Sequence, residues 1–252
     1  MYKLERKLSP EEFRQTFVRA NKQDHNRQPH PWDLLFRDGK CTREQLKGWA
    51  KERYYFVQQV PIKEYGILFN CPHPEVRRIW LSKAIEEEGE DIIGREHGPH
   101  PEYWLRVCEA LGLTREYVLN SDPLPAVKFA VDTFAQMVTK SWLLGIAVSE
   151  GEDTAKGMVR DLDIFRKYYS WVAEEALEFY KLHSEVDVGH AQIRMDILVK
   201  YCTTKELQEE CIDAQLIKNN IRRVMTDAIY MAYVVQGLKC DANGFVGKEA
   251  RA

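Results

Sequence analysis

The stretch Leu182-His183-Ser184-Glu185-Val186-Asp187-Val188-Gly189-His190 spaces two histidines and an aspartate as His-x-x-x-Asp-x-x-His. At about 3.6 residues per turn, positions i, i+4 and i+7 lie on one face of a helix. Apolar residues between Phe179 and Ile197 share that side, so we expect the face to point inward. Two imidazoles and a carboxylate on one stripe suit first-row metal ions. The plainer interpretation is a solvated polar face, or a histidine that caps a helix.

The composition is that of a globular protein with a sizeable core. Of its 252 residues 44% are hydrophobic. The net charge of −3 gives no reason to expect nucleic acid or an anionic membrane as a partner. Six scattered cysteines without a C-x-x-C pair suit a reducing compartment. Because the sequence has no apolar run of membrane-spanning length and no signal-peptide pattern, we expect a soluble cytoplasmic protein.

Helical periodicity fills the chain, and no alternating strand pattern interrupts it. Ser9 and Thr42 are predicted N-caps of the first two long helices. Pro61 is predicted to kink or break the second of them. Residues 113–125 are expected to form a connector, and residues 126–148 one long apolar helix.

The pattern as a whole predicts an all-α protein. Seven or eight helical segments follow one another with short connections and without a fixed repeat. We expect residues 1–236 to form one domain, a compact helical bundle, and residues 237–252 a flexible tail.

Two polar segments admit two interpretations each. The segment from His25 to Asp33 is too rich in proline and polar residues for a helix interior, and its histidines either line a pocket or hold a loop by hydrogen bonds. Glu86-Glu87-Glu88 ends a helix at Gly89. Acids at a helix C-terminus are unfavourable against the helix dipole. These acids therefore either face solvent or have a compensating cation, such as a metal ion.

Several further stretches carry a family resemblance. They include Trp49-Ala50-Lys51-Glu52-Arg53-Tyr54-Tyr55, Pro61-Ile62-Lys63, Asn70-Cys71-Pro72, Trp104-Leu105 and Phe129-Ala130-Val131-Asp132. Over nearly the whole chain, residues 8–236, the sequence resembles the pyrroloquinoline-quinone synthases of the PqqC type. The resemblance implies the haem-oxygenase-like, TenA/PqqC-type helical fold. It also implies that Arg53, Lys63 and Lys218, which match cationic positions of that family, bind an anionic group of a substrate.

At two positions the chain departs from the quinone synthases. Those enzymes use no metal, have a histidine where this chain has Glu87, and have an active-site tyrosine where it has Phe134. At the changed positions the chain is similar to the haem-oxygenase-like di-iron oxidases of the same superfamily. That resemblance implies six metal ligands: Glu87, His100, Glu152, His183, Asp187 and His190. It leaves open His97 in place of His100, and Glu150 in place of Glu152.

The implied cofactor is a pair of iron ions, because carboxylates and neutral imidazoles are suitable ligands for iron; manganese fits the same donors. With O2, such a site would oxidise a small amino-acid-like substrate by N-oxygenation, oxidative C–C cleavage, or nitrile or alkene formation. Phe134 would belong to the substrate-binding wall, where aromatic rings stack. The resemblance leaves room for an external reductant and, by analogy, for a homodimer.

Two other functions stay open at this point. One is a metal-free oxidase of the PqqC type that acts on a cofactor precursor. The other is a para-aminobenzoate synthase-like or non-catalytic relative that has kept the fold. The para-aminobenzoate route uses a tyrosine shortly after a histidine in the first loop, and Asp33 stands at the corresponding place here.

Overall fold

The computed structural model describes residues 1–89, 98–149 and 152–240, and for residues 152–155 and 184–190 it describes the backbone alone. The regular structure of this part of the chain is helical, without a strand, which confirms the all-α prediction. Twelve α-helices occur in it, more than the seven or eight expected, because several are short. In chain order the elements are α1 (Pro10–Gln23), the 3-10 turn η1 (His25–Arg27), α2 (Pro31–Arg37), α3 (Arg43–Val57), α4 (Gln59–Asn70), α5 (Pro74–Glu87), α6 (His100–Ala110), α7 (Arg115–Asn120), α8 (Pro125–Lys140), α9 (Trp142–Ala147), α10 (Glu152–Tyr168), the 3-10 turn η2 (Glu174–Leu177), α11 (Glu178–Tyr201), α12 (Lys205–Ile229) and the π-helical turn η3 (Tyr230–Val235).

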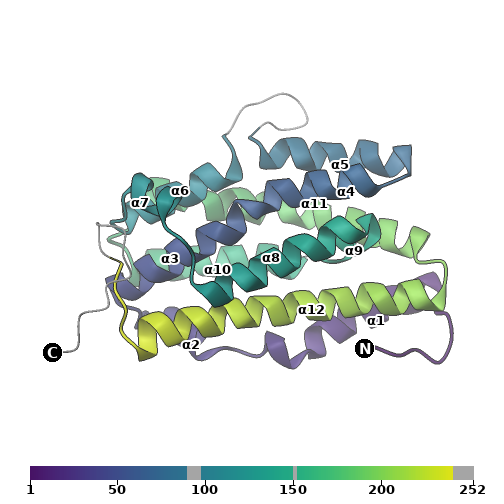
Figure 1. The fold of residues 1–252 in the computed structure, drawn as a ribbon, viewed down its shortest axis with the longest axis horizontal. Helices are drawn as coiled ribbons and strands as arrows, with labels where there is room; N and C mark the ends of the chain where they lie inside the picture. Colours follow the sequence, from purple (N-terminus) through teal and green to yellow (C-terminus); the bar gives the residue numbers. More distant parts are fainter. Residues whose placement is uncertain (90–97, 150–151, 241–252) are drawn as a thin grey trace.

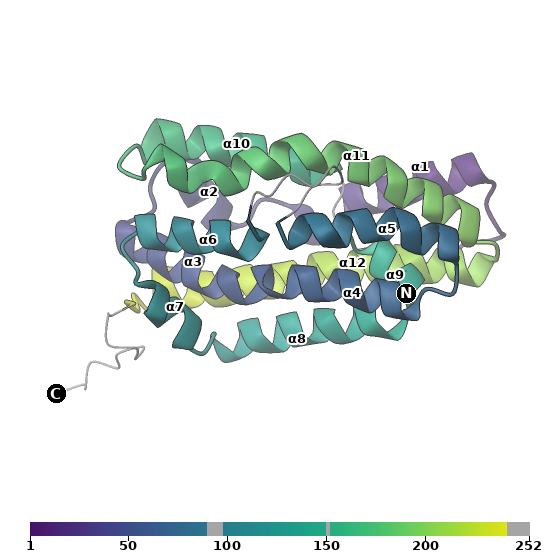
Figure 2. The same ribbon diagram turned by 90° about the horizontal axis from the view of Figure 1, so that it is seen from above.

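Most of the long helices run along the long axis of the molecule (Figure 1). α10 and α11 pack along each other, and α12 packs against α8 and α1. α3 packs against α6 and α4 against α5, and Figure 2 shows α6 and α5 end to end in one row. Because α11 also packs against α6, three elements meet where α5 ends and α6 begins.

The predicted helix starts at Ser9 and Thr42 are confirmed. Each forms a capping box, in which its side chain accepts from the backbone N–H three residues on and the side chain of that residue accepts in return. The second helix breaks at Gln58, between α3 and α4. Pro61 lies in the first turn of α4, where its missing N–H leaves no helical hydrogen bond unmade.

The sequence pattern was wrong about residues 113–148 in two respects. The expected connector contains α7, which Thr114 caps through the N–H of Tyr117. The expected single helix over 126–148 is broken at Ser141, whose backbone is extended and whose side chain caps α9. Apolar periodicity continues across the break, so the pattern alone gave no signal of it.

A buried carboxylate, Glu52, holds the end of the fold near α7 together. It is fully buried, and it accepts from the Lys51 ammonium at 2.9 Å and from the Tyr233 hydroxyl at 2.8 Å. Its second oxygen accepts from the N–H of Leu124 at 2.7 Å, which attaches the start of α8. Cys240 is buried near Tyr233. Residues 241–252 of the expected tail lie outside the described residues.

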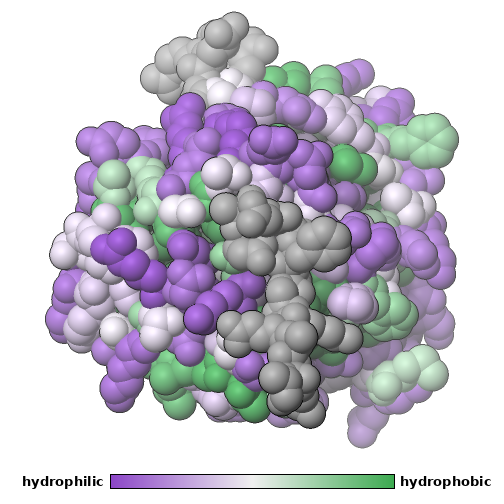
Figure 3. Space-filling model, turned by 60° about the vertical axis from the view of Figure 1, so that its left-hand side comes forward, coloured by the Kyte–Doolittle hydropathy of each residue, from purple (hydrophilic) through white to green (hydrophobic). Residues whose placement is uncertain are grey.

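The face in Figure 3 is largely hydrophilic, with apolar patches separated by polar side chains. Among the described residues, no helix combines the length and the apolar character that crossing a bilayer requires.

Replacing Gly48 tests the packing of η3 on α3. A Cβ at Gly48 would overlap the Tyr233 ring. Overpacking of this kind costs about 1–3 kcal/mol, so we expect Gly48→Ala to lower Tm by several degrees in thermal unfolding followed by circular dichroism.

The matched control is Gly66→Ala in α4. A Cβ there would meet only Thr139 Cγ2, at 3.3 Å, and alanine is a better helix former than glycine by about 1 kcal/mol. Equal Tm values for the two variants would contradict the packing described.

Candidate metal centre

The candidate site lies where α5 and α6 meet end to end. Glu87 is the last residue of α5 and His100 the first of α6. Between them, the N–H of Gly98 donates to the carbonyl of Gly89 at 3.3 Å. Both glycines have positive φ, 103° and 88°, and a Cβ at Gly89 would overlap the backbone of Gly98. This contact between the two glycines holds the end of α5 beside the start of α6.

Three of the six predicted ligands come together at this junction. His100 Nδ1 lies 2.6 Å from Glu87 Oε2, and the rings of His100 and His183 are 4.6 Å apart, centre to centre. One donor atom from each of Glu87, His100 and His183 lies within 4.8 Å of the others. Glu87 and His100 are buried and His183 is half-buried. These residues are far apart in sequence and come from three helices.

The orientation of His183 is set by its own helix. His183 Nδ1 lies 2.8 Å from the carbonyl oxygen of Phe179, one turn earlier in α11. A carbonyl only accepts, so Nδ1 carries the proton and Nε2 keeps its lone pair for another partner. A backbone carbonyl on the far nitrogen is a common arrangement for a metal-ligating histidine. The Phe179 ring also packs against the imidazole, at 4.2 Å between ring centres.

The buried Glu87 carboxylate is held in its charged form by its neighbours. Burial alone would raise its pKa, but His100, His183 and Lys83 outweigh burial, and the pKa of Glu87 lies well below its usual range. A carboxylate at a helix C-terminus is also opposed by the helix dipole. Positive charge at this point is therefore favourable, and a divalent cation would supply more of it than the imidazoles do.

The donor set fits a first-row metal ion. Two imidazoles and one carboxylate are the ligands of the facial triad found in non-haem Fe(II) oxygenases. The cores of helical bundles also hold di-metal carboxylate sites with ligands from facing helices. Glu152 begins α10, and Asp187 and His190 lie in α11, but their side chains are not described. His97 and Glu150 lie outside the described residues, so both ligand alternatives stay open.

The four residues predicted to bind substrate are not gathered in one place. Arg53 lines a cavity of about 360 Å³. Phe134 is buried behind the wall of that cavity, where its ring packs against Phe56 at 5.4 Å. Lys63 is buried and paired with Glu64 at 2.8 Å. The Lys218 ammonium lies 3.3 Å from the carbonyl oxygen of Ser149, after α9. Binding of substrate by these residues stays a prediction.

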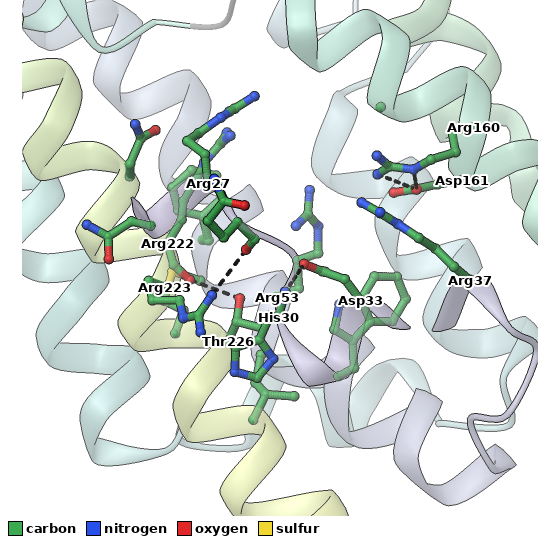
Figure 4. Close-up of a pocket in the computed structure, with 18 of the residues that line it drawn as sticks. Arg27, His30, Asp33, Arg37, Arg53, Arg160, Asp161, Arg222, Arg223 and Thr226 are labelled. Carbon is green, nitrogen blue, oxygen red and sulfur yellow. Dashed lines mark hydrogen bonds and ion pairs between the residues drawn. The ribbon is translucent and has the colours of Figure 1, made fainter. Parts of the chain in front are cut away.

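The cavity contains residues that sequence reasoning missed. Five more arginines line it, Arg27, Arg37, Arg160, Arg222 and Arg223, together with Asp161 (Figure 4). Asp33 also lines it, from the segment that was expected to line a pocket or to form a loop. Burial raises the pKa of the Asp161 carboxyl, although Arg160 opposes the rise. Among these positions, only Arg222, one turn after Lys218 in α12, has a spacing that could have drawn notice.

His30 satisfies both interpretations given to its segment. It lines the cavity, and it caps α2 by accepting from the N–H of Trp32 at 2.9 Å through Nδ1. Since Nδ1 accepts, Nε2 carries the proton and donates to Asp227 at 2.8 Å.

Comparison with known proteins gives a consistent result. The family described as TENA/THI-4/PQQC matches residues 15–218. The chain is similar to the pyrroloquinoline-quinone synthase of Cronobacter sakazakii, with 33% identity over 237 residues that cover 92% of this chain and 91% of that protein. The enzyme of the same name from Acinetobacter baylyi is 30% identical over 237 residues, covering 91% and 89%.

Solved structures share the fold. A domain of unknown function with a haem-oxygenase-like fold from Shewanella denitrificans matches with a TM-score of 0.69 at 16% identity, over 96% of both chains. A TenA homologue from Pseudomonas syringae matches with a TM-score of 0.70 at 15% identity, over 91% of this chain and 100% of that one. The expected haem-oxygenase-like, TenA-type fold is thereby confirmed.

Removing the Glu87 charge tests the candidate metal centre. We expect metal-depleted protein to bind Co²⁺ with a visible d–d absorption band, and Glu87→Gln to weaken binding by about 10–100-fold, because an amide oxygen replaces a charged ligand. Titration followed by visible absorption measures both.

Glu88→Gln is the matched control, since Glu88 is the exposed neighbour of Glu87 at the end of α5. Equal weakening in the two variants would show that the Glu87 side chain is not a ligand.

Proposed function

Because the chain belongs to the TENA/THI-4/PQQC family, we propose that it is an oxidoreductase that uses O2 to oxidise a small molecule. The observation that carries this proposal is the Glu87–His100–His183 group, in which Glu87 and His100 are buried and His183 is half-buried. Its composition of two histidines and one carboxylate is that of non-haem Fe(II) oxygenase sites. The relatives named pyrroloquinoline-quinone synthase support the class of reaction.

Within this proposal, Glu87, His100 and His183 hold iron at the α5–α6 junction. Iron bound there would supply the chemistry that activates O2. Glu152, Asp187 and His190 are the residues we propose for a second iron position.

The surrounding residues orient the ligands and exclude water. Phe179 fixes the tautomer of His183 through its carbonyl. Trp104, which is fully buried, packs edge-on against Phe179 at 4.9 Å between ring centres. His100 first, then His183 and Lys83, lower the pKa of Glu87 against the effect of burial and hold its carboxylate in the ionised form. A dry, preorganised site of this kind strengthens every electrostatic interaction inside it.

A second candidate is a metal-free oxidase that acts on a cofactor precursor. The names of the relatives favour it. The 2.6 Å contact between Glu87 and His100 also favours it, because a carboxylate beside an imidazole can form an acid–base pair that moves a proton at a substrate. The two candidates share the O2-dependent oxidation and differ in whether iron is required.

Anaerobic titration of the metal-depleted protein with ferrous iron tests the proposal. We expect saturable binding, and a pulse of O2 should then convert bound iron to a ferric form with a charge-transfer band in the visible spectrum. His183→Ala should lose both effects, because its imidazole is one of the ligands that we propose.

A spectrum that is identical in His183→Ala and in the parent protein would contradict the iron site. Absence of iron binding, combined with tight binding of pyrroloquinoline quinone by the metal-depleted protein, would support the second candidate instead.

A further inference from the structure

Two buried cysteines lie in contact where α11 ends and α12 begins. Cys202 is the C-cap of α11, and Cys211 lies in the second turn of α12. Their sulfur atoms are 3.4 Å apart, and their exposed fractions are 2% and 0%. All six cysteines of the chain are free thiols. The reduced protein therefore holds two thiol groups side by side at this point.

The turn between the two helices holds the pair in this position. The N–H of Cys202 donates to the carbonyl of Leu198 at 2.9 Å, which closes α11. Two residues later, the Thr204 side chain caps α12 by accepting from the N–H of Leu207 at 3.2 Å. Both helix ends are thus fixed around a short turn, and the contact between the sulfurs follows from the backbone.

The N-terminal segment also fixes the start of α12. Gln208 accepts from the N–H of Leu8 at 2.8 Å and donates to its carbonyl at 3.0 Å, and Glu209 accepts from the N–H of Leu4 at 2.6 Å. A disulfide bond is about 2.05 Å long, so the two sulfurs would have to approach by about 1.3 Å. Rotation of the two side chains can supply that movement while both helix ends stay in place.

The pair lies next to an exposed turn. Thr203 and Thr204 are both exposed, and Cys202 directly before them is buried. The hydrogen bond with Cys202, together with burial, raises the pKa of the Cys211 thiol well above its usual range. A thiol with a raised pKa reacts slowly, because the thiolate is the reactive form. Oxidation of the pair therefore needs a small, uncharged oxidant that can pass the turn, and hydrogen peroxide is one.

We propose that Cys202 and Cys211 form a redox-sensitive pair, which hydrogen peroxide converts to a disulfide that joins the end of α11 to the start of α12. In a reducing compartment the pair stays as two thiols. The inference depends neither on the proposed oxidase function nor on bound iron.

The reaction takes two steps, and each step releases one water. One sulfur, as the thiolate, attacks an oxygen of the peroxide; the O–O bond breaks, a sulfenic acid forms, and the departing hydroxide takes up the proton that the thiol lost. The second thiol then attacks the sulfenic sulfur, the S–O bond breaks, and the S–S bond forms with release of the second water. Two electrons pass from the two sulfurs to the peroxide.

The disulfide would link two helices that the fold otherwise holds through shared neighbours. α11 and α12 both pack against α1 and α9. A covalent link between residues nine positions apart also restricts the unfolded chain, which stabilises the folded state. We therefore expect the oxidised protein to unfold at a temperature several degrees above that of the reduced protein.

Peroxide treatment of the reduced, metal-depleted full chain tests the proposal. After the peroxide is removed, the protein is unfolded with an alkylating reagent, and mass spectrometry locates the thiols that have been lost. We expect two of the six thiols to disappear and a linked pair of peptides to contain Cys202 and Cys211. Tm, followed by circular dichroism, should rise and should return to its original value after reduction with dithiothreitol.

Cysteine variants locate the reaction. Cys202→Ala should lose both the linked peptides and the rise in Tm. Cys71→Ala is the matched control, because Cys71 is likewise the C-cap of a helix, α4, and is 4% exposed. It should respond to peroxide as the parent protein does. Cys211→Ala removes the other half of the pair and decides the matter if Cys202→Ala does not fold.

Four results would overturn the proposal: no loss of thiols, a linked peptide pair that involves other cysteines, sulfinic acid at either position in place of the disulfide, or an equal rise in Tm in Cys202→Ala. Since the experiment uses protein without metal and measures no turnover, failure of the iron site would leave its outcome unaffected. The two proposals therefore fail separately.

Discussion

The structure depends on a carboxylate that is buried at the end of a helix. Glu87 is buried at the C-terminus of α5, where the helix dipole opposes its charge, so its carboxylate loses hydration at a cost in free energy. Two imidazoles and the ammonium of Lys83 compensate for that cost. His100 can compensate for the buried charge only if α6 begins where α5 ends. His183 can compensate for it only if α11 passes beside the junction. The end-to-end row of α5 and α6 in Figure 2 thus serves to surround one negative charge.

The buried charges of the neighbouring helices are likewise compensated by charges of opposite sign. Glu64 in α4 accepts from the Trp80 indole at 2.6 Å, pairs with Lys63, and lies 3.6 Å from Lys83. Lys83 therefore stands between two carboxylates, Glu64 and Glu87, and couples α4 to the candidate metal centre. Removing one member of such a group leaves an uncompensated buried charge, which is far more costly than losing an exposed pair.

Sequence reasoning was most successful where the signal is local. The caps at Ser9 and Thr42 depend on residues three positions apart, and periodicity identified the helical class. The break at Ser141 was missed because its extended backbone does not disturb the apolar pattern. Spacing alone pointed to His183, and the position of Glu87 among acids at a helix end hinted at a compensating cation. His100 was named only through a family resemblance, since no periodicity connects it to the others. Most of the arginine-lined cavity was missed because its lining comes from five elements; only Arg53 and the segment around His30 were singled out from the sequence.

The contact between Gly89 and Gly98 also bears on how such chains diversify. The backbones of the two glycines lie against each other, because a Cβ at Gly89 would overlap Gly98, and both positions have a positive φ that other residues rarely adopt. This backbone contact, and not the number of residues between the glycines, determines the distance from Glu87 to His100. Evolution can therefore lengthen, shorten or rewrite the intervening sequence without separating the two candidate ligands. This makes the stretch a natural place for related proteins to acquire different substrates around an unchanged centre.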